Sequence, residues 1–182
     1  YDGLIISKDD GTTFNKFKTV TDLSGPNTIL DIYVDNGTIY TANRNSGGLS
    51  ISKDGGSTFI RKTKADGLGS DDVNCVYASG NTIYAGTADG LSISTDGGKT
   101  FINKSTANSK LPSNSVSKIA VSGSTLYISF EYGRSLALSK DGGETFFVKD
   151  TTNGLGSAII KSLFVSGSTV YVGTEGGLSR SK

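Results

Sequence analysis

The chain has 182 residues and a net charge of +1, and 35% of its residues are hydrophobic. This length allows one domain with a sizeable core, or a row of small units that share one, and the near-neutral charge gives no electrostatic reason to expect nucleic acid or an anionic membrane as a partner. The lack of histidine excludes His triads and His metal sites, and no apolar run approaches the roughly 18 residues of a membrane span.

The first expected element is a strand at residues 4–7, which leads into a turn of the pattern S-x-D-x-G-x-T-F. This turn, called the aspartate turn below, occurs four times, and a fifth copy begins at Ser181. The serines of successive copies lie 45, 42, 45 and 42 residues apart. The recurring positions are Ser7, Asp9, Gly11, Thr13 and Phe14; Ser52, Asp54, Gly56, Thr58 and Phe59; Ser94, Asp96, Gly98, Thr100 and Phe101; and Ser139, Asp141, Gly143, Thr145 and Phe146.

Each repeat predicts four short strands. In the third repeat, the pattern of apolar residues predicts strands at 115–122, 125–129, 136–139 and 145–149. Pairs such as Gly123–Ser124 join the first two strands and supply the positive φ angles of two-residue hairpins. Nothing in the chain shows a sustained apolar period near 3.6, so we expect essentially no helix.

Residues 87 apart match better than nearest neighbours, since 66–70 (DGLGS) pairs with 153–157 (NGLGS). The repeats therefore form a pair of units that is duplicated. The units run over about 7–51, 52–93, 94–138 and 139–180, within a single domain over 1–182.

Four short antiparallel strands every 42 to 45 residues are typical of the blades of an all-β propeller. One such sheet cannot bury both of its faces alone, and stacking against its neighbours does so. The chain begins at the third strand of one blade and ends after the third strand of another, at 178–181. We expect a four-bladed ring, in which the N-terminal and C-terminal strands share a blade and one strand is spare. The alternative is an arc of a larger ring.

The aspartate turn resembles the Asp-box, or BNR repeat, of sialidases, other glycosidases, sortilin-type receptors and bacterial surface propellers. The resemblance covers the whole chain in four copies. It implies a propeller in which each motif lies on the hairpin between the third and fourth strands of a blade.

The aspartate turns are expected to stabilise the fold. The aspartate accepts hydrogen bonds from nearby backbone N–H groups, the glycine allows positive φ, and Phe14, Phe59, Phe101 and Phe146 are expected to point inward. Each turn offers only one or two carboxylates, far fewer than the six to eight oxygens that Ca²⁺ prefers. We therefore expect no metal and no cofactor. The single cysteine, Cys75, cannot form an intrachain disulfide and is expected to be a small core residue.

We expect no enzymatic activity and assign no catalytic residue. Sialidases use three arginines, a Tyr/Glu pair and an Asp, and the four arginines of this chain match no arginine motif of that family. The adjacent carboxylates Asp9–Asp10 and Asp71–Asp72 point to opposite sides if they lie in strands, so they are interpreted as solvated turn residues.

The loops between the second and third strands of each blade are expected to surround a central channel. Exposed polar and aromatic side chains there suit a glycan or a protein ligand, although a variable loop without a ligand is the alternative. The candidate ligand-binding residues are Asn43, Arg44, Asn45, Asp89, Glu131, Tyr132, Arg134 and Glu175.

These observations favour a non-enzymatic binding, scaffold or adhesion module, with a carbohydrate or protein ligand. The alternatives are a glycosidase-associated propeller and a structural unit that assembles blades with other chains, including homo-oligomers through edge strands. We expect a secreted or cell-surface protein of bacterial source, without membrane insertion. Because the chain has no methionine, we also expect a processed form or a piece of a longer protein.

Overall fold

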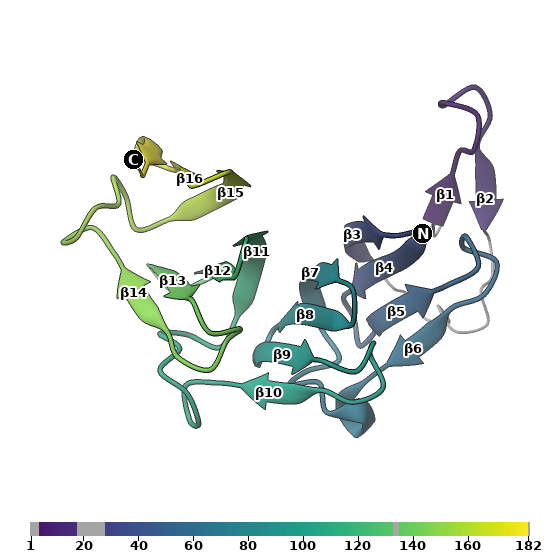
Figure 1. Cartoon of the computed structure of the whole chain (residues 1–182), viewed down its shortest axis with the longest axis horizontal. Coiled ribbons are helices and arrows are strands. Elements are labelled where there is room, and N and C mark those ends of the chain that lie inside the picture. The colour runs from purple at the N-terminus through teal and green to yellow at the C-terminus, as the bar shows by residue number, and fades with distance from the viewer. Residues whose placement is uncertain (1–3, 18–27, 133–134, 182) are drawn as a thin grey trace.

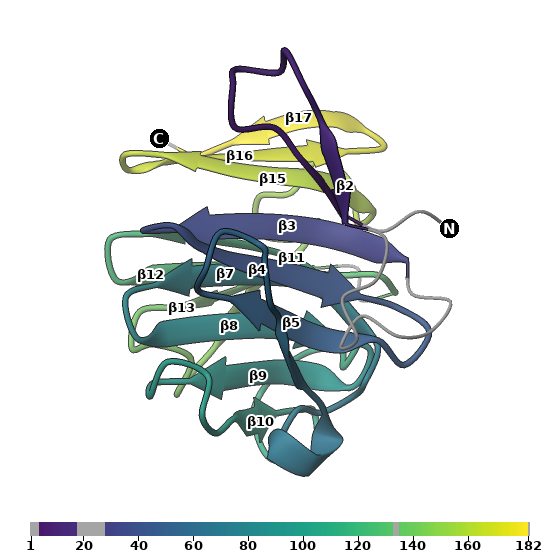
Figure 2. The same ribbon diagram turned by 90° about the vertical axis from the view of Figure 1, so that its right-hand side faces the viewer.

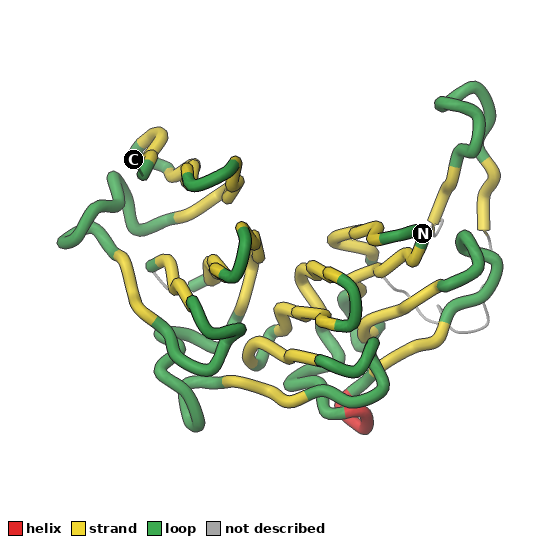
Figure 3. Tube along the Cα trace, viewed as in Figure 1, coloured by secondary structure: helices red, strands yellow, loops and turns green. Residues whose placement is uncertain are grey.

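The computed structural model describes residues 4–17, 28–132 and 135–181. In these residues the chain forms seventeen strands in five antiparallel sheets and one short 3₁₀ helix, η1 (Lys64–Asp66). The sheets follow one another in an arc, with the N-terminal hairpin at one end and the last sheet at the other (Figure 1). Figure 3 shows η1 as the one helical turn among the described strands and loops.

Three sheets have four strands each and are called blades 1, 2 and 3. Blade 1 comprises β3 (Ile29–Asp35), β4 (Thr38–Asn43), β5 (Gly48–Ser52) and β6 (Ile60–Lys62). Blade 2 comprises β7 (Val73–Ser79), β8 (Thr82–Thr87), β9 (Gly90–Ser94) and β10 (Ile102–Lys104). Blade 3 comprises β11 (Val116–Ser122), β12 (Thr125–Phe130), β13 (Leu136–Ser139) and β14 (Phe147–Lys149).

Two partial sheets flank these blades. The N-terminal hairpin comprises β1 (Leu4–Ile6) and β2 (Asn15–Phe17), and the C-terminal blade comprises β15 (Ile160–Ser166), β16 (Thr169–Thr174) and β17 (Gly177–Arg180). Seen from the side, β15, β16 and β17 run in roughly the same direction as β3, whereas β2 of the N-terminal hairpin runs across them (Figure 2).

The hairpins between the first two strands of each blade follow the sequence prediction. Asn36 and Gly37 have φ angles of 46° and 79°, and Gly80, Gly123 and Gly167 at the equivalent turns have φ between 56° and 58°. Positive φ matches the twist of a two-residue turn to that of its strands. The predicted strands of the third repeat are confirmed to within two residues at each end.

The cores lie between blades. One cluster joins Tyr40, Leu49 and Ile51 of blade 1 to Val76 and Ile83 of blade 2, and a second joins blade 2 to blade 3 in the same way. Blade 2 is covered on both faces and is the most buried blade. The first four residues of its inner strand, β7, are all buried. Cys75 lies in this core and is 1% exposed, as expected. Its burial raises the pKa of the thiol well above the ordinary range.

The structure has the arc and not the closed ring. Among the described strands, β1 pairs with β2 alone, and β15–β17 form a separate sheet. Leu4 of β1 is held in a cluster with Ile39 and Phe59 of blade 1, which places the hairpin at the start of the arc. The N-terminal hairpin and the C-terminal blade therefore lie at opposite ends (Figure 1).

Candidate functional site

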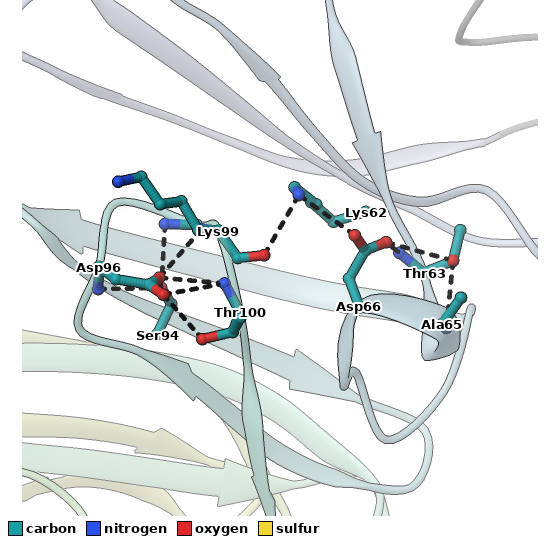
Figure 4. Close-up of polar contacts among 9 residues, drawn as sticks. Lys62, Thr63, Ala65, Asp66, Ser94, Asp96, Lys99 and Thr100 are labelled. Carbon is teal, nitrogen blue, oxygen red and sulfur yellow. Dashed lines mark hydrogen bonds and ion pairs between the residues drawn. The ribbon is translucent and has the colours of Figure 1, made fainter.

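The aspartate turns connect the third and fourth strands of each blade, where the sequence placed them. In the second copy, Asp54 accepts hydrogen bonds from the Thr58 backbone N–H at 2.9 Å, the Thr58 hydroxyl at 2.6 Å and the Ser52 hydroxyl at 2.8 Å. Gly56 N–H donates to Ser52 Oγ at 2.9 Å. The other three copies repeat this network, and Figure 4 shows it around Asp96.

These hydrogen bonds stabilise the ionised carboxylate. They lower the pKa of Asp9 and of Asp54 from 3.8 to about 2, with the Thr13 or Thr58 hydroxyl as the largest cause, and they lower the pKa of Asp96 and Asp141 further. The carboxylates are thus used within the turns, which is the fold-stabilising role expected for them.

The turns also join one blade to the one before it. A Cβ added to Gly98 would lie 2.7 Å from Ile51 Cδ1 of the preceding blade, and one added to Gly143 would lie 2.5 Å from Ile93 Cδ1. Phe59, Phe101 and Phe146 are buried at these junctions. Phe14 is the exception, and its expected inward position is wrong. It is 64% exposed, because the described chain has no blade before the N-terminal hairpin against which its ring could pack.

The loops between second and third strands lie at one end of the blades, together with the segments that precede the inner strands. The residue after the second strand donates its backbone N–H to the carbonyl of the residue just before the first strand in all four blades: Arg44 to Thr28, Ala88 to Asp72, Glu131 to Ser115 and Glu175 to Ile159. This repeated bond confirms that the two sets of loops share one face. That face is called the channel mouth below.

A β-bulge at the start of each inner strand shapes the channel mouth. The register of the first two strands shifts between Ile29 and Asp31, Val73 and Cys75, Val116 and Lys118, and Ile160 and Ser162. Bulges re-aim a side chain relative to its sheet. The bulged residues are Leu30, Asn74, Ser117 and Lys161, one from each blade. No sequence motif identifies these residues as site residues. The only sequence signal they share is that they occupy equivalent positions in the four repeats.

Three of the bulged residues line a cavity of about 200 Å³ at the channel mouth, together with Arg44, Lys118 and Glu131. Arg44 Nη2 lies 3.0 Å from Glu131 Oε2, so an ion pair joins blade 1 to blade 3 beside blade 2. Ser115 also donates its hydroxyl to this carboxylate at 3.2 Å. The structure thus brings together two of the residues predicted from the loops.

Asn74 supplies the least satisfied polar group of this cavity. Its side chain is 6% exposed, and its Nδ2 donates to the Val116 carbonyl at 2.8 Å. Within the described residues its Oδ1 has no hydrogen-bond partner. A buried acceptor of this kind is costly unless a donor reaches it.

The other predicted loop residues divide into three groups. Asn43 was expected to be exposed and is fully buried, with Nδ2 donating to the carbonyls of Thr41 and Gly48 in its own blade. Asp89 accepts a hydrogen bond from Asn114 at 2.8 Å, and Glu175 forms an ion pair with Lys161 at 2.8 Å. Tyr132 is 80% exposed, Asn45 lies in the exposed β4–β5 loop, and Arg134 lies outside the described residues.

The described residues contain no group of three or more His, Cys, Asp and Glu side chains arranged to hold a metal ion. In the same part of the chain, no helix has the length and apolar character needed to cross a membrane.

No protein-family model matches the sequence, and the search of curated proteins gives no match. Several solved structures are similar. The extracellular domain of BT3049 from B. thetaiotaomicron, described as a hybrid two-component system, matches 99% of this chain with 22% identity and a TM-score of 0.73. A YCF48 structure bound to a D1 peptide matches 84% with 22% identity and a TM-score of 0.61, and an ancestral GH74 enzyme matches 84% with 19% identity and a TM-score of 0.66.

The chain spans 24%, 50% and 22% of the lengths of these three proteins, respectively. At these identities the likeness shows the fold alone. Together with the stacked antiparallel sheets, it shows that the chain folds as consecutive blades of a β-propeller.

Proposed function

We propose that the chain is a ligand-binding and scaffold module whose binding site is the cavity at the channel mouth. The observation that carries this proposal is the convergence of bulged residues from three blades on one polar cavity, where the buried Oδ1 of Asn74 lacks a donor. Polar groups that converge in this way orient a ligand. We also propose that the aspartate turns are Asp-boxes in the sense of the BNR propellers, on the basis of their sequence pattern and hydrogen bonds.

The cavity favours a small polar group as the part of the ligand that enters. Its volume of about 200 Å³ is below the range of roughly 300–1,000 Å³ typical of small-molecule sites. One sugar unit or one polar side chain of a peptide is therefore the suitable size. Tyr132, which follows Glu131 in the β12–β13 loop, offers an exposed aromatic surface, and aromatic rings suit both kinds of ligand.

The descriptions of two similar structures support this choice of ligand classes. One is an ancestral GH74 enzyme, and the other is a YCF48 protein bound to a peptide. We propose a carbohydrate or protein ligand and no catalysis at this site. The extracellular location of the BT3049 domain supports our proposal that this module is secreted or at a cell surface, in a bacterium.

The test compares two charge-neutral double variants. Arg44→Ala/Glu131→Ala removes the ion pair at the cavity, and Lys161→Ala/Glu175→Ala removes a similar exposed ion pair of the C-terminal blade as the control. A glycan array and a peptide library identify a ligand for the unmodified chain, and calorimetry then measures its Kd. We expect the first variant to raise Kd at least ~10-fold, about 1.4 kcal/mol, and the control to leave it within about twofold.

Equal Kd values for the two variants would show that the ligand binds elsewhere. The glycosidase-associated alternative is tested in parallel with aryl glycosides. Release of the aryl group by the unmodified chain, and its loss in Glu131→Gln, would replace the binding proposal with an enzymatic one.

A further inference from the structure

A second cavity, of about 270 Å³, lies at the junction between blades 2 and 3, and it is called the junction groove below. Blade 2 lines it from β8, β9, β10 and the ends of its own aspartate turn, and the aspartate turn of blade 3 lines the other side. The groove shares no lining residue with the cavity at the channel mouth. Both blades have all four strands, so the two sides of the groove are present in the described chain.

An apolar row crosses blade 2 at the base of the junction groove. Tyr84, Ile93 and Ile102 are direct cross-strand partners on β8, β9 and β10, so their side chains share one face of the sheet. Ile93 is 8% exposed and belongs to the core between blades 2 and 3, whereas Tyr84 is half-buried and Ile102 is 69% exposed. The row therefore leads from the core into the groove, where it offers an aromatic ring and an aliphatic side chain to a ligand.

Hydroxyl groups line the groove beside this row. They belong to three threonines of blade 2, Thr82, Thr95 and Thr100. Thr100 Oγ1 donates its proton to Asp96 Oδ2 at 2.7 Å (Figure 4), so this oxygen can act toward a ligand only as an acceptor.

A charged pair joins the two sides of the groove. Lys104 Nζ of β10 lies 2.8 Å from Glu144 Oε2 of the facing turn. Within the described residues neither side chain makes another hydrogen bond, which leaves N–H groups of Lys104 and Oε1 of Glu144 for a ligand. Asp141, also in the lining, already accepts three hydrogen bonds from Ser139 and Thr145 inside its own turn.

The equivalent junction between blades 1 and 2 has a different lining. There the tyrosine is Tyr40, which is 4% exposed, so its ring is closed to a ligand. Glu144 takes the repeat position of Lys99, and Thr95 takes the position at which the other three aspartate turns have a lysine, namely Lys8, Lys53 and Lys140. Compared with the junction of blades 1 and 2, the junction groove thus has a short hydroxyl side chain and a carboxylate in place of two lysines.

This lining matches one neutral sugar unit. A pyranose has a face of C–H groups, which packs on an aromatic or aliphatic surface, and hydroxyl groups that each donate and accept hydrogen bonds. The groove offers both kinds of contact, and its volume of about 270 Å³ lies just below the roughly 300 Å³ of the smallest typical ligand sites, which suits a single ring. Two carboxylates and one ammonium group in the lining disfavour an anionic ligand. We propose that the junction groove is a second binding site, which holds a neutral sugar unit of a glycan independently of the channel mouth.

The test titrates the isotope-labelled chain with the methyl glycosides of glucose, galactose and mannose and follows the backbone amides by two-dimensional NMR. We expect at least one glycoside to shift the amides of β10 and of residues 141–145. The uronic acid counterpart of that sugar should bind at least ~3-fold more weakly, because the carboxylates of the groove repel it.

Thr95→Lys should raise the Kd of that glycoside at least ~10-fold, because a long cationic side chain then occupies the groove. The fold tolerates this change, since lysine occupies the same position in the other aspartate turns. Ser57→Lys is the matched control. It adds the same charge to the aspartate turn of blade 1, at the position that Lys99 takes in blade 2, and should leave the Kd within about twofold.

Equal Kd values for Thr95→Lys and Ser57→Lys, or amide shifts confined to the channel mouth, would overturn the proposal. So would a uronic acid that binds as tightly as its neutral sugar, or a lack of shifts with all three glycosides. The channel-mouth proposal is judged separately, because Arg44→Ala/Glu131→Ala should leave binding at the junction groove unchanged.

Discussion

Single carboxylates hold the aspartate turns in shape. Each lies at the surface or partly buried, and its pKa is lowered because hydroxyl and backbone N–H donors of the same turn converge on the charged form. The recurrence of serine, threonine and glycine at fixed distances from the aspartate has this physical cause. The three side chains and the turn backbone are one hydrogen-bonded unit.

We predict that acid weakens the fold within a definite pH window. The pKa of Asp54 is about 2 in the folded chain and near its ordinary 3.8 when unfolded, so the unfolded state binds more protons between these values. The stability contributed by Asp54 is complete above pH 4 and is lost as the pH falls through 2. Urea unfolding at a series of pH values between 5 and 2 should show a shallower loss for Asp54→Asn than for the unmodified chain. An identical pH dependence would contradict the role given to this carboxylate.

The strands and turns of a blade depend on close backbone approach at a few glycines. Gly48 begins β5 with φ of 71°, and a Cβ placed there would lie 2.2 Å from the Lys62 carbonyl oxygen of β6. Gly37 in the β3–β4 hairpin also has positive φ, at 79°, but a Cβ there would meet no atom within 4 Å. The two glycines share the conformational requirement and differ in the available space.

This pair therefore separates backbone strain from collision. Gly37→Ala should cost about 1–2 kcal/mol of unfolding free energy, because an L-residue is strained at positive φ. Gly48→Ala carries the same strain and must also move β5 away from β6, so we expect a loss greater by at least ~1 kcal/mol. Chemical denaturation of both variants measures the difference. Equal losses would show that the blade absorbs the added methyl group without moving its strands.

The whole arc is stabilised from its middle outward, because a blade is covered on both faces only when it has a neighbour on each side. β7 of blade 2 is buried along most of its length, whereas β15 of the C-terminal blade is exposed at four of its seven residues. The apolar residues left exposed at that end include Ile159, Phe164 and Leu178.

We predict a gradient of amide hydrogen exchange along the chain. The amides of β7 and β8 should exchange most slowly, and those of β16 and β17 several orders of magnitude faster, since terminal repeats open without disturbing the rest. Mass spectrometry of peptides after timed exchange measures this gradient. Uniform exchange across all blades would show that the arc unfolds as one cooperative unit.

The local structure could be read from the sequence because it depends on neighbouring residues. The Asn36–Gly37 turn and the hydrogen bonds around Asp54 involve groups within four residues of one another, and the repetition of these patterns predicted the blades. The candidate site was predicted less well. Arg44 and Glu131 were found because their loops are long, while Asn43 was misplaced, since burial depends on strands that pack around it.

The sequence by itself determined the repeat, the strand pairing within each blade and the turn chemistry, because these are set by contacts between residues close along the chain. Only the tertiary structure decided the open arc, the bulged residues that meet at the channel mouth, and the exposure of Phe14. These features depend on how successive blades lie against one another, and blade curvature is the sum of packing at several junctions.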